Sequence, residues 1–125
     1  MKVLFSKNSP AAIGPYSQGT EFNGLCFFSG QIALDPSSGE MIQTSFEHEV
    51  HQVMRNISNL LKDSELNFCD ILKVNISLTD MNNFAVFNDI YSTYVVEPYP
   101  ARACVGVSSL PRGANVEIEV IVSRK

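Results

Sequence analysis

One arginine lies inside a short run of small and apolar residues that is typical of a β-strand. Arg102 stands in the segment Pro-Ala-Arg-Ala-Cys-Val-Gly-Val, residues 100–107. A guanidinium stays charged at any physiological pH, and burying it without a partner is costly. Arg102 is therefore expected to meet water, a carboxylate or an anionic ligand.

Two carboxylates share one face of a second predicted strand. Residues 116–122 alternate with period two, so Glu117 and Glu119 point to one side and the valines point to the other. If residues 108–115 turn the chain, the two strands can pair as neighbours and bring Arg102 and Glu117 to one surface. The sequence leaves the register of this pairing open.

An arginine that clamps a carboxylate and a glutamate that holds a water form a minimal site for hydrolysing a small anionic substrate without a cofactor. A structural alternative stays open, in which Arg102 simply pairs across strands with Glu117 or Glu119. Substrate binding requires that the second edge of the guanidinium be free.

Cysteine and histidine suggest weaker alternatives. Cys104 shares the face of Arg102 by parity, and a cation lowers the pKa of a nearby thiol, but no histidine accompanies it as a base. A small core residue whose main chain lines the pocket is the favoured interpretation. His48 and His51 lie beside Glu47 and Glu49 on a predicted helix, where a solvated face is favoured over a metal site.

Composition narrows the class of protein. The chain has 125 residues, 45% of them hydrophobic and 18% charged, which suits one globular domain over residues 1–125. Its net charge is −4 and its nine Lys and Arg residues are scattered, so a nucleic-acid partner is not expected. The three cysteines lack disulfide or zinc spacing, and no signal-peptide or membrane-spanning segment is visible, so a cytoplasmic protein is expected.

A hairpin is predicted near the start of the chain. Segments 16–22 and 25–30 flank Asn23-Gly24, a strong two-residue turn signal that sets Phe22 opposite Leu25. This register brings Tyr16 and Ser17 close to Ser29-Gly30, beside a proline-rich lead-in at residues 9–15. We expect the rim of a pocket there.

Two helices and a further strand follow. Thr44 and Glu47 have capping-box spacing, and an apolar stripe with helical period runs from residue 46 to about residue 62. Residues 70–80 alternate as a strand, with Leu72 on the apolar side, and a second helix is predicted from about Asn83 until Pro98 forbids it.

Two helices can cover only one face of a sheet of five or six strands. The other face is expected to be solvated or to meet further subunits, and an oligomer is favoured. The polar residues assigned to this uncovered face are Lys73, Asn75, Arg102, Cys104, Glu117 and Glu119.

Several separated motifs, in this order, resemble the Rid family, also called the YjgF family, over essentially all 125 residues. The motifs are Gly-Pro-Tyr-Ser-Gln at 14–18, Ser-Gly-Gln-Ile at 29–32, residues 82–88, Pro-Ala-Arg at 100–102, Leu-Pro at 110–111 and Glu-Ile-Glu at 117–119. The resemblance implies an α+β, chorismate-mutase-like fold: a mixed sheet of about six strands with two helices on one face. It also implies a homotrimer with three pockets between subunits.

The resemblance further implies the activity and the site. Arg-bearing relatives are deaminases that hydrolyse 2-iminobutanoate and 2-iminopropanoate, reactive products of pyridoxal-phosphate-dependent dehydratases, to 2-oxoacids and ammonia. By this resemblance Arg102 grips the carboxylate of the imino acid or 2-oxoacid and Glu117 orients the water, with no cofactor and no metal. The remaining pocket residues are Tyr16, which is also assigned to catalysis, and Ser29, Gly30, Asn88 and Cys104.

Alternative functions remain within this family. One is a regulator or chaperone-like protein that binds a small 2-oxoacid without turnover, and another is an endoribonuclease or translation inhibitor. The acidity of the chain disfavours the second. Gly106 and the approach at residues 97–99 depart from many relatives, which leaves the preferred substrate side chain open.

Overall fold

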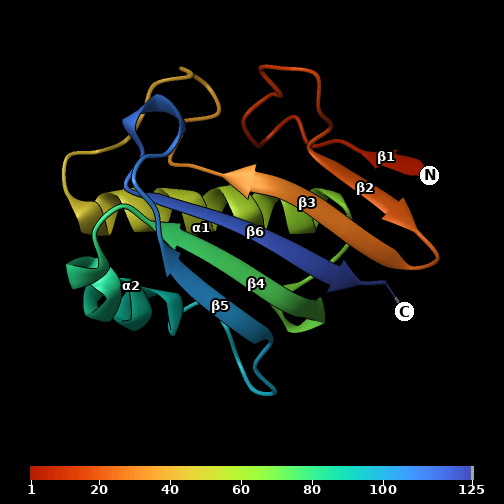
Figure 1. Cartoon of the computed structure of the whole chain (residues 1–125). Helices are drawn as coiled ribbons and strands as arrows, with labels where there is room; N and C mark the ends of the chain where they lie inside the picture. Colours follow the sequence, from red (N-terminus) through yellow and green to blue (C-terminus); the bar gives the residue numbers. More distant parts are fainter. Residues whose placement is uncertain (125) are drawn as a thin grey trace.

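Six strands form one mixed sheet in the computed structural model, which describes residues 1–124 (Figure 1). The sheet order is β1-β2-β3-β6-β4-β5; β4 and β5 are parallel, and the other neighbours are antiparallel. The strands are β1 (Lys2–Leu4), β2 (Gly19–Phe22), β3 (Leu25–Gln31), β4 (Ile71–Leu78), β5 (Ala101–Gly106) and β6 (Val116–Ser123). The helices are α1 (Phe46–Asp63) and α2 (Phe84–Tyr91), with 3₁₀ turns η1 (Phe68–Asp70), η2 (Met81–Asn83) and η3 (Pro111–Gly113).

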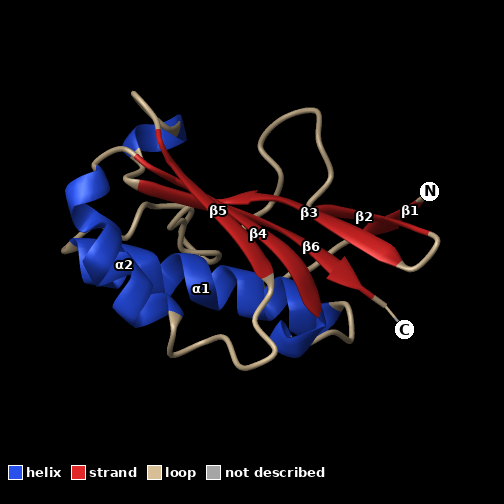
Figure 2. Cartoon of the chain, turned by 60° about the horizontal axis from the view of Figure 1, so that its bottom comes forward, coloured by secondary structure: helices blue, strands red, loops and turns tan. Residues whose placement is uncertain are grey.

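Both α-helices lie on the same face of the sheet (Figure 2). The stripe of α1 is buried as predicted, with Val50 and Val53 at 0% exposure and Ile57 at 2%. It packs against the apolar face of β6, where Val116 and Val122 are also at 0%. The predicted α+β architecture, with about six strands and two helices on one face, is confirmed.

The helix boundaries differ slightly from prediction. The N-cap of α1 is Ser45, whose hydroxyl accepts a hydrogen bond from the His48 amide at 3.0 Å. Thr44 instead bonds the His48 ring, so the predicted capping box of Thr44 and Glu47 is wrong, and the N-cap lies one residue later. Helix α2 is preceded by η2 and ends at Tyr91, well before Pro98.

The hairpin formed by β2 and β3 has the predicted turn and register. Asn23 and Gly24 both take positive φ, 52° and 79°, and Phe22 pairs with Leu25. The strand β2 begins only at Gly19, so Tyr16 precedes the ladder. The predicted proximity of Ser17 to Ser29 is nevertheless confirmed, because the Ser29 hydroxyl donates to the Ser17 carbonyl at 2.6 Å.

An irregularity in β4 reverses the predicted orientation of one side chain, that of Leu72. Val74, Ile76 and Leu78 are buried as expected, but Leu72 is 47% exposed. The register between β4 and β6 shifts between Ile71 and Lys73, and the extra residue turns Leu72 outward.

The strands that carry Arg102 and Glu117 are not neighbours. Strand β4 lies between β5 and β6, so the predicted direct pairing of these two strands is wrong (Figure 1). A parallel β4–β5 pair needs a long crossover, and α2 supplies it. Strand β5 becomes the edge of the sheet as a result.

The second face of the sheet carries no α-helix (Figure 2). Apolar side chains are exposed on it, including Phe27 at 44% and Val105 at 52%. The expected uncovered face is therefore present. Within residues 1–124, no helix has the length and apolar character needed to cross a membrane.

Candidate functional site

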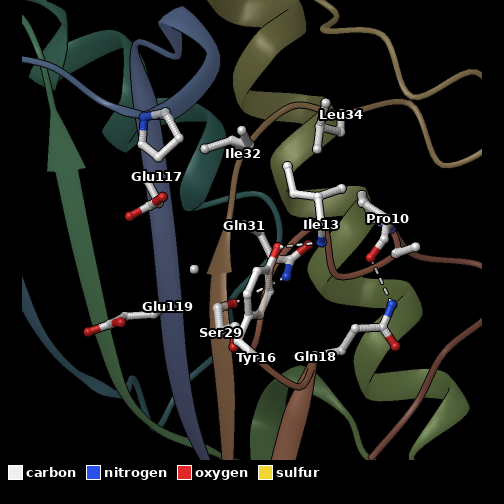
Figure 3. Close-up of a pocket in the computed structure, with 13 residues that line it drawn as sticks. Pro10, Ile13, Tyr16, Gln18, Ser29, Gln31, Ile32, Leu34, Glu117 and Glu119 are labelled. Atoms are coloured by element: carbon white, nitrogen blue, oxygen red, sulfur yellow. Dashed lines mark hydrogen bonds between the residues drawn. The ribbon is translucent and has the colours of Figure 1, made fainter.

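A cavity of about 430 Å³ opens between the proline-rich lead-in, the end of β3 and the start of β6 (Figure 3). Four predicted site residues line it: Tyr16, Ser29, Gly30 and Glu117. The register of β3 against β6 shifts between Phe28 and Gln31, and the residues at this irregularity, Ser29 and Gly30, line the cavity. We call this cavity the glutamate half-site.

The carboxyl group of Glu117 lies directly over the backbone of Gly30. A Cβ atom added to Gly30 would come within 2.9 Å of the Glu117 Cδ, so only glycine leaves this space open. Burial, with a smaller contribution from the charge of Glu119, raises the pKa of Glu117. A carboxylate held in this way is a stronger base than an ordinary glutamate.

Substituting Gly30 tests this packing. Gly30→Ala is expected to push the Glu117 side chain aside, because the clash falls on the end of a side chain and not on backbone. We expect about a 10²-fold loss of activity with little change in melting temperature. Turnover and thermal unfolding measured on the same sample check this, and an active variant would contradict the close approach.

Ser29 and Tyr16 contribute in different ways. The Ser29 hydroxyl donates to the Ser17 carbonyl, so this side chain fixes the lead-in beside the cavity. Tyr16 is 49% exposed, and its hydroxyl accepts a hydrogen bond from the Ile13 amide at 3.3 Å (Figure 3). Tyr16 therefore faces the cavity from a loop that it also helps to fold.

Gln18 is a residue that the sequence interpretation missed. It is 5% exposed, and its side-chain oxygen accepts from the Ser6 amide at 2.7 Å. Its side-chain nitrogen donates to the Pro10 carbonyl at 2.8 Å (Figure 3). These bonds hold one wall of the glutamate half-site. One sequence signal could have indicated this role. Gln18 has an amide side chain and follows a proline-rich segment whose backbone groups, lacking regular pairing, need side-chain hydrogen-bond partners.

Arg102 lies in a second cavity, of about 380 Å³, at the free edge of β5. Its guanidinium donates to Asn88 Oδ1 at 2.6 Å and stacks over the rings of Phe84 and Tyr91, at 5.6 and 5.1 Å from their centroids. No other described group accepts a hydrogen bond from it. The remaining donors of this exposed fork are free for an anion, so we call this cavity the arginine half-site.

The two half-sites lie on opposite faces of the sheet. Arg102 pairs with Val74, which in turn pairs with Val120, so these three side chains point toward the helices. Glu117 follows the buried Val116 on β6 and points to the open face. The expectation that Arg102 and Cys104 occupy the uncovered face is wrong, because parity within a strand does not fix which face β5 presents.

This separation excludes the alternative in which Arg102 pairs across strands with Glu117 or Glu119. Among residues 1–124, Arg102 forms no ion pair with Glu117 or Glu119, and the nearest partner of Glu119 is Asn75 Nδ2 at 3.1 Å. No described residue of the same chain therefore neutralises Arg102. Cross-strand pairing of Arg102 with these carboxylates does not occur in the described chain.

Cys104 shares the helix-facing side with Arg102, as parity predicted, and packs partly against the core. Burial raises the pKa of the Cys104 thiol, and Arg102 only partly opposes this. The thiol form is thus favoured, which agrees with a packing residue rather than a nucleophile.

The two histidines of α1 bind different partners. His48 Nδ1 lies 2.7 Å from the Thr44 hydroxyl, whereas His51 Nδ1 lies 2.7 Å from the Tyr94 hydroxyl. His51 is thus partly buried against Tyr94 and does not lie on a solvated face. Over residues 1–124, no three His, Cys, Asp or Glu side chains converge as metal ligands.

Comparison with known proteins gives a consistent family match. The family model described as Endoribonuclease L-PSP matches residues 6–124. A 2-iminobutanoate/2-iminopropanoate deaminase from Mus musculus is 42% identical over 120 residues, covering 96% of this chain and 89% of its own. AldR from Lactococcus lactis, which is named as a regulator, is 44% identical over 125 residues, covering 100% and 99%.

Solved structures agree in fold over the whole chain. RidA from the Antarctic bacterium Psychrobacter sp. PAMC 21119 superposes with a TM-score of 0.94 at 37% identity, covering 98% of this chain and 99% of its own. TdcF from E. coli, solved with bound serine, superposes with a TM-score of 0.93 at 32% identity, covering 100% of each chain.

Proposed function

Because the chain belongs to the endoribonuclease L-PSP family, the family of the Rid (YjgF) proteins, we propose that it is a 2-iminobutanoate/2-iminopropanoate deaminase. The deaminase relative from Mus musculus is 42% identical over nearly the whole chain. The substrates would be small 2-imino acids and the products 2-oxoacids and ammonia. The arrangement that carries the proposal is the pair of half-sites, one with a free cationic fork and one with a basic carboxylate.

The two half-sites require a second copy of the chain. Arg102 and Glu117 point to opposite faces of one sheet, so a small substrate cannot touch both in a single chain. In the proposed homotrimer, the Arg102 edge of one subunit would close over the glutamate half-site of the next. The exposed apolar side chains of the uncovered face, such as Phe27, support burial of that face between subunits.

The reaction follows from these groups. Arg102 would bind the substrate carboxylate through the donors that Asn88 leaves free, and the stacked rings would hold its plane. Glu117 would accept a proton from water as the oxygen adds to the C=N carbon. Glu117 would then pass that proton to the nitrogen of the tetrahedral carbinolamine. As the C–N bond breaks and ammonia leaves, the carbinolamine hydroxyl would give its own proton to Glu117, so that the carbonyl forms, and Glu117 would release this proton to the departing ammonia.

The imine supplies its own electrophile, so the chemistry needs no cofactor. A protonated imine carbon is readily attacked, and positioning of water and substrate provides the rate enhancement. The raised pKa of Glu117 suits both halves of its task, because the same group must take a proton and return it.

A trapping experiment tests the proposal. A dehydratase generates 2-iminobutanoate in the cuvette and semicarbazide competes for it, with and without this protein. We expect less semicarbazone and faster release of 2-oxobutanoate when the protein is present. Unchanged trapping would reject deamination.

A regulatory function is the second candidate, supported by the relative named as a regulator, AldR. A protein that senses a 2-oxoacid would bind 2-oxobutanoate at Arg102 and leave the trapping rate unchanged. Cleavage of RNA, suggested by the family description, is disfavoured by the net charge of −4.

The pH dependence follows from Glu117. Because burial raises its pKa and the base must be ionised, kcat/KM should rise with pH through a limb that lies above the ordinary titration range of glutamate. Glu119→Gln should move this limb to lower pH, because the charge of Glu119 contributes to the raised pKa. pH–rate profiles of the wild type and of Glu119→Gln check this. If the limb lies at the same pH in both proteins, the base is a group other than Glu117.

A further inference from the structure

A carboxylate outside both half-sites is almost completely buried. Glu49, in the first turn of α1, is 1% exposed. None of the described cationic side chains forms an ion pair with it. Burying a carboxylate is costly unless several hydrogen bonds compensate, so its partners indicate what it does.

Those partners belong to the segment that leads into β6. Glu49 Oε2 accepts from the Asn115 amide at 2.7 Å, and Oε1 accepts from Asn115 Nδ2 at 2.8 Å. Gln43 Nε2 donates to Glu49 Oε2 at 3.3 Å and to the Gly113 carbonyl at 2.9 Å. Both oxygens of the carboxylate therefore hold Asn115, and Gln43 links the same carboxylate to Gly113.

Asn115 is also held from the sheet side. Its carbonyl accepts from the Thr79 amide at 3.2 Å, and its Oδ1 accepts from the Thr79 hydroxyl at 3.3 Å. Asn115 is thus clamped between α1 and the end of β4. Arg112 and Gly113 both take left-handed φ, 59° and 68°, so the preceding turn is tight and gains from this anchor.

The clamp lies two residues before Glu117. Val116, which is fully buried and pairs with Leu78, is the one residue between Asn115 and Glu117, so the clamp fixes the backbone that leads directly into Glu117. Pro111, in the same segment, lines the glutamate half-site. We propose that Glu49 is a positioning residue that holds the Glu117 carboxylate over Gly30. The effect of Glu49 on catalysis rests on the proposed function.

The fold alone does not require a charge at this place. The apolar stripe of α1 supplies the packing against the sheet, and an uncharged acceptor would satisfy the Asn115 amide. A bidentate carboxylate fixes both the main chain and the side chain of Asn115, which is the stiffness that a precisely placed base needs.

Kinetics of matched variants test this role. Glu49→Gln removes the charge and one acceptor, and Asn115→Ala removes the side-chain bonds of Asn115 to Glu49 and Thr79 without changing any charge. We expect kcat to fall about 10- to 100-fold in both, with KM changed little because the arginine half-site is intact. The control is Glu21→Gln, the same chemical change at a carboxyl group that is 14% exposed and bound to Arg124 in a different cavity. It should lose stability without losing kcat.

Titration of Glu117 provides a readout that does not depend on activity. Its ¹³C-labelled side-chain carboxyl, assigned with Glu117→Gln, should titrate at lower pH in Asn115→Ala, because a loosened β6 admits water to it. Glu119 and Tyr16 are the other titratable groups lining this cavity, and neither is altered. Asn115→Ala can still test the positioning role if Glu49→Gln fails to fold.

The outcomes separate the two proposals. An unchanged Glu117 titration and unchanged kcat in Asn115→Ala, or equal changes in Glu21→Gln, would overturn the positioning role. A wild-type protein that leaves imine trapping unchanged would instead reject the deaminase, while the Glu117 titration would still decide whether Asn115 and Glu49 hold that carboxylate.

Discussion

Glu117→Gln is expected to lower imine hydrolysis by about 10²- to 10⁴-fold, the range for removal of a general base. The amide cannot accept a proton from water at neutral pH, but it has nearly the same volume and leaves the Gly30 contact in place. The affinity for 2-oxobutanoate should therefore stay close to wild type. The semicarbazide assay measures the rate, and calorimetric titration with 2-oxobutanoate measures binding.

Glu119→Gln is the matched control for this prediction. Glu119 lies two residues further along the same strand, lines the same cavity and accepts from Asn75. Its amide variant should retain most of the activity at a pH where Glu117 is ionised. Full activity in Glu117→Gln, or an equal loss in Glu119→Gln, would remove the general-base role from Glu117.

Arg102→Ala is expected to weaken binding of 2-oxobutanoate about 10²-fold or more. A hydrogen bond to a charged group contributes about 1.5–3 kcal/mol, and a bidentate pair supplies two. The affinity of Arg102→Lys for 2-oxobutanoate should lie between those of wild type and Arg102→Ala. Lysine keeps the charge but loses the planar guanidinium and its hydrogen-bond geometry to Asn88. Binding by calorimetry and kcat/KM in the trapping assay both report this loss.

Mixing the two inactive variants tests whether the site is shared between subunits. If the protein is the proposed homotrimer and Arg102→Ala and Glu117→Gln chains are refolded together, each mixed trimer would contain one interface that joins an intact Arg102 to an intact Glu117. An equal mixture should then recover about a quarter of wild-type activity. Mixed trimers that stay inactive would show that both residues must come from one chain.

Much of the framework was predictable from local pattern. The apolar stripe of α1, the Asn23-Gly24 turn and the alternation along β6 each depend on residues close together in the sequence. The motifs that resemble the Rid family were also readable, and the family match over residues 6–124 confirms them. Leu72 is the exception within a strand, because a bulge depends on the partner strand as well as on its own sequence.

The half-sites were only partly predictable. Tyr16, Ser29, Gly30 and Glu117 gather in one cavity, as the hairpin register and the family resemblance indicated. The positioning groups Gln18 and Glu49 were missed, since their partners are loop carbonyls and amides whose positions no sequence pattern specifies.

The sequence by itself determined the alternation along the strands except at Leu72, which face of α1 is apolar, and which side chains have the chemistry to bind an anion and activate water. Only the tertiary structure decided that β4 separates β5 from β6 and that Arg102 faces the helices while Glu117 faces away. The physical reason is that period two fixes the relative faces of residues within one strand. The face that each strand turns to the core depends on sheet order and register, which are set by packing between distant segments.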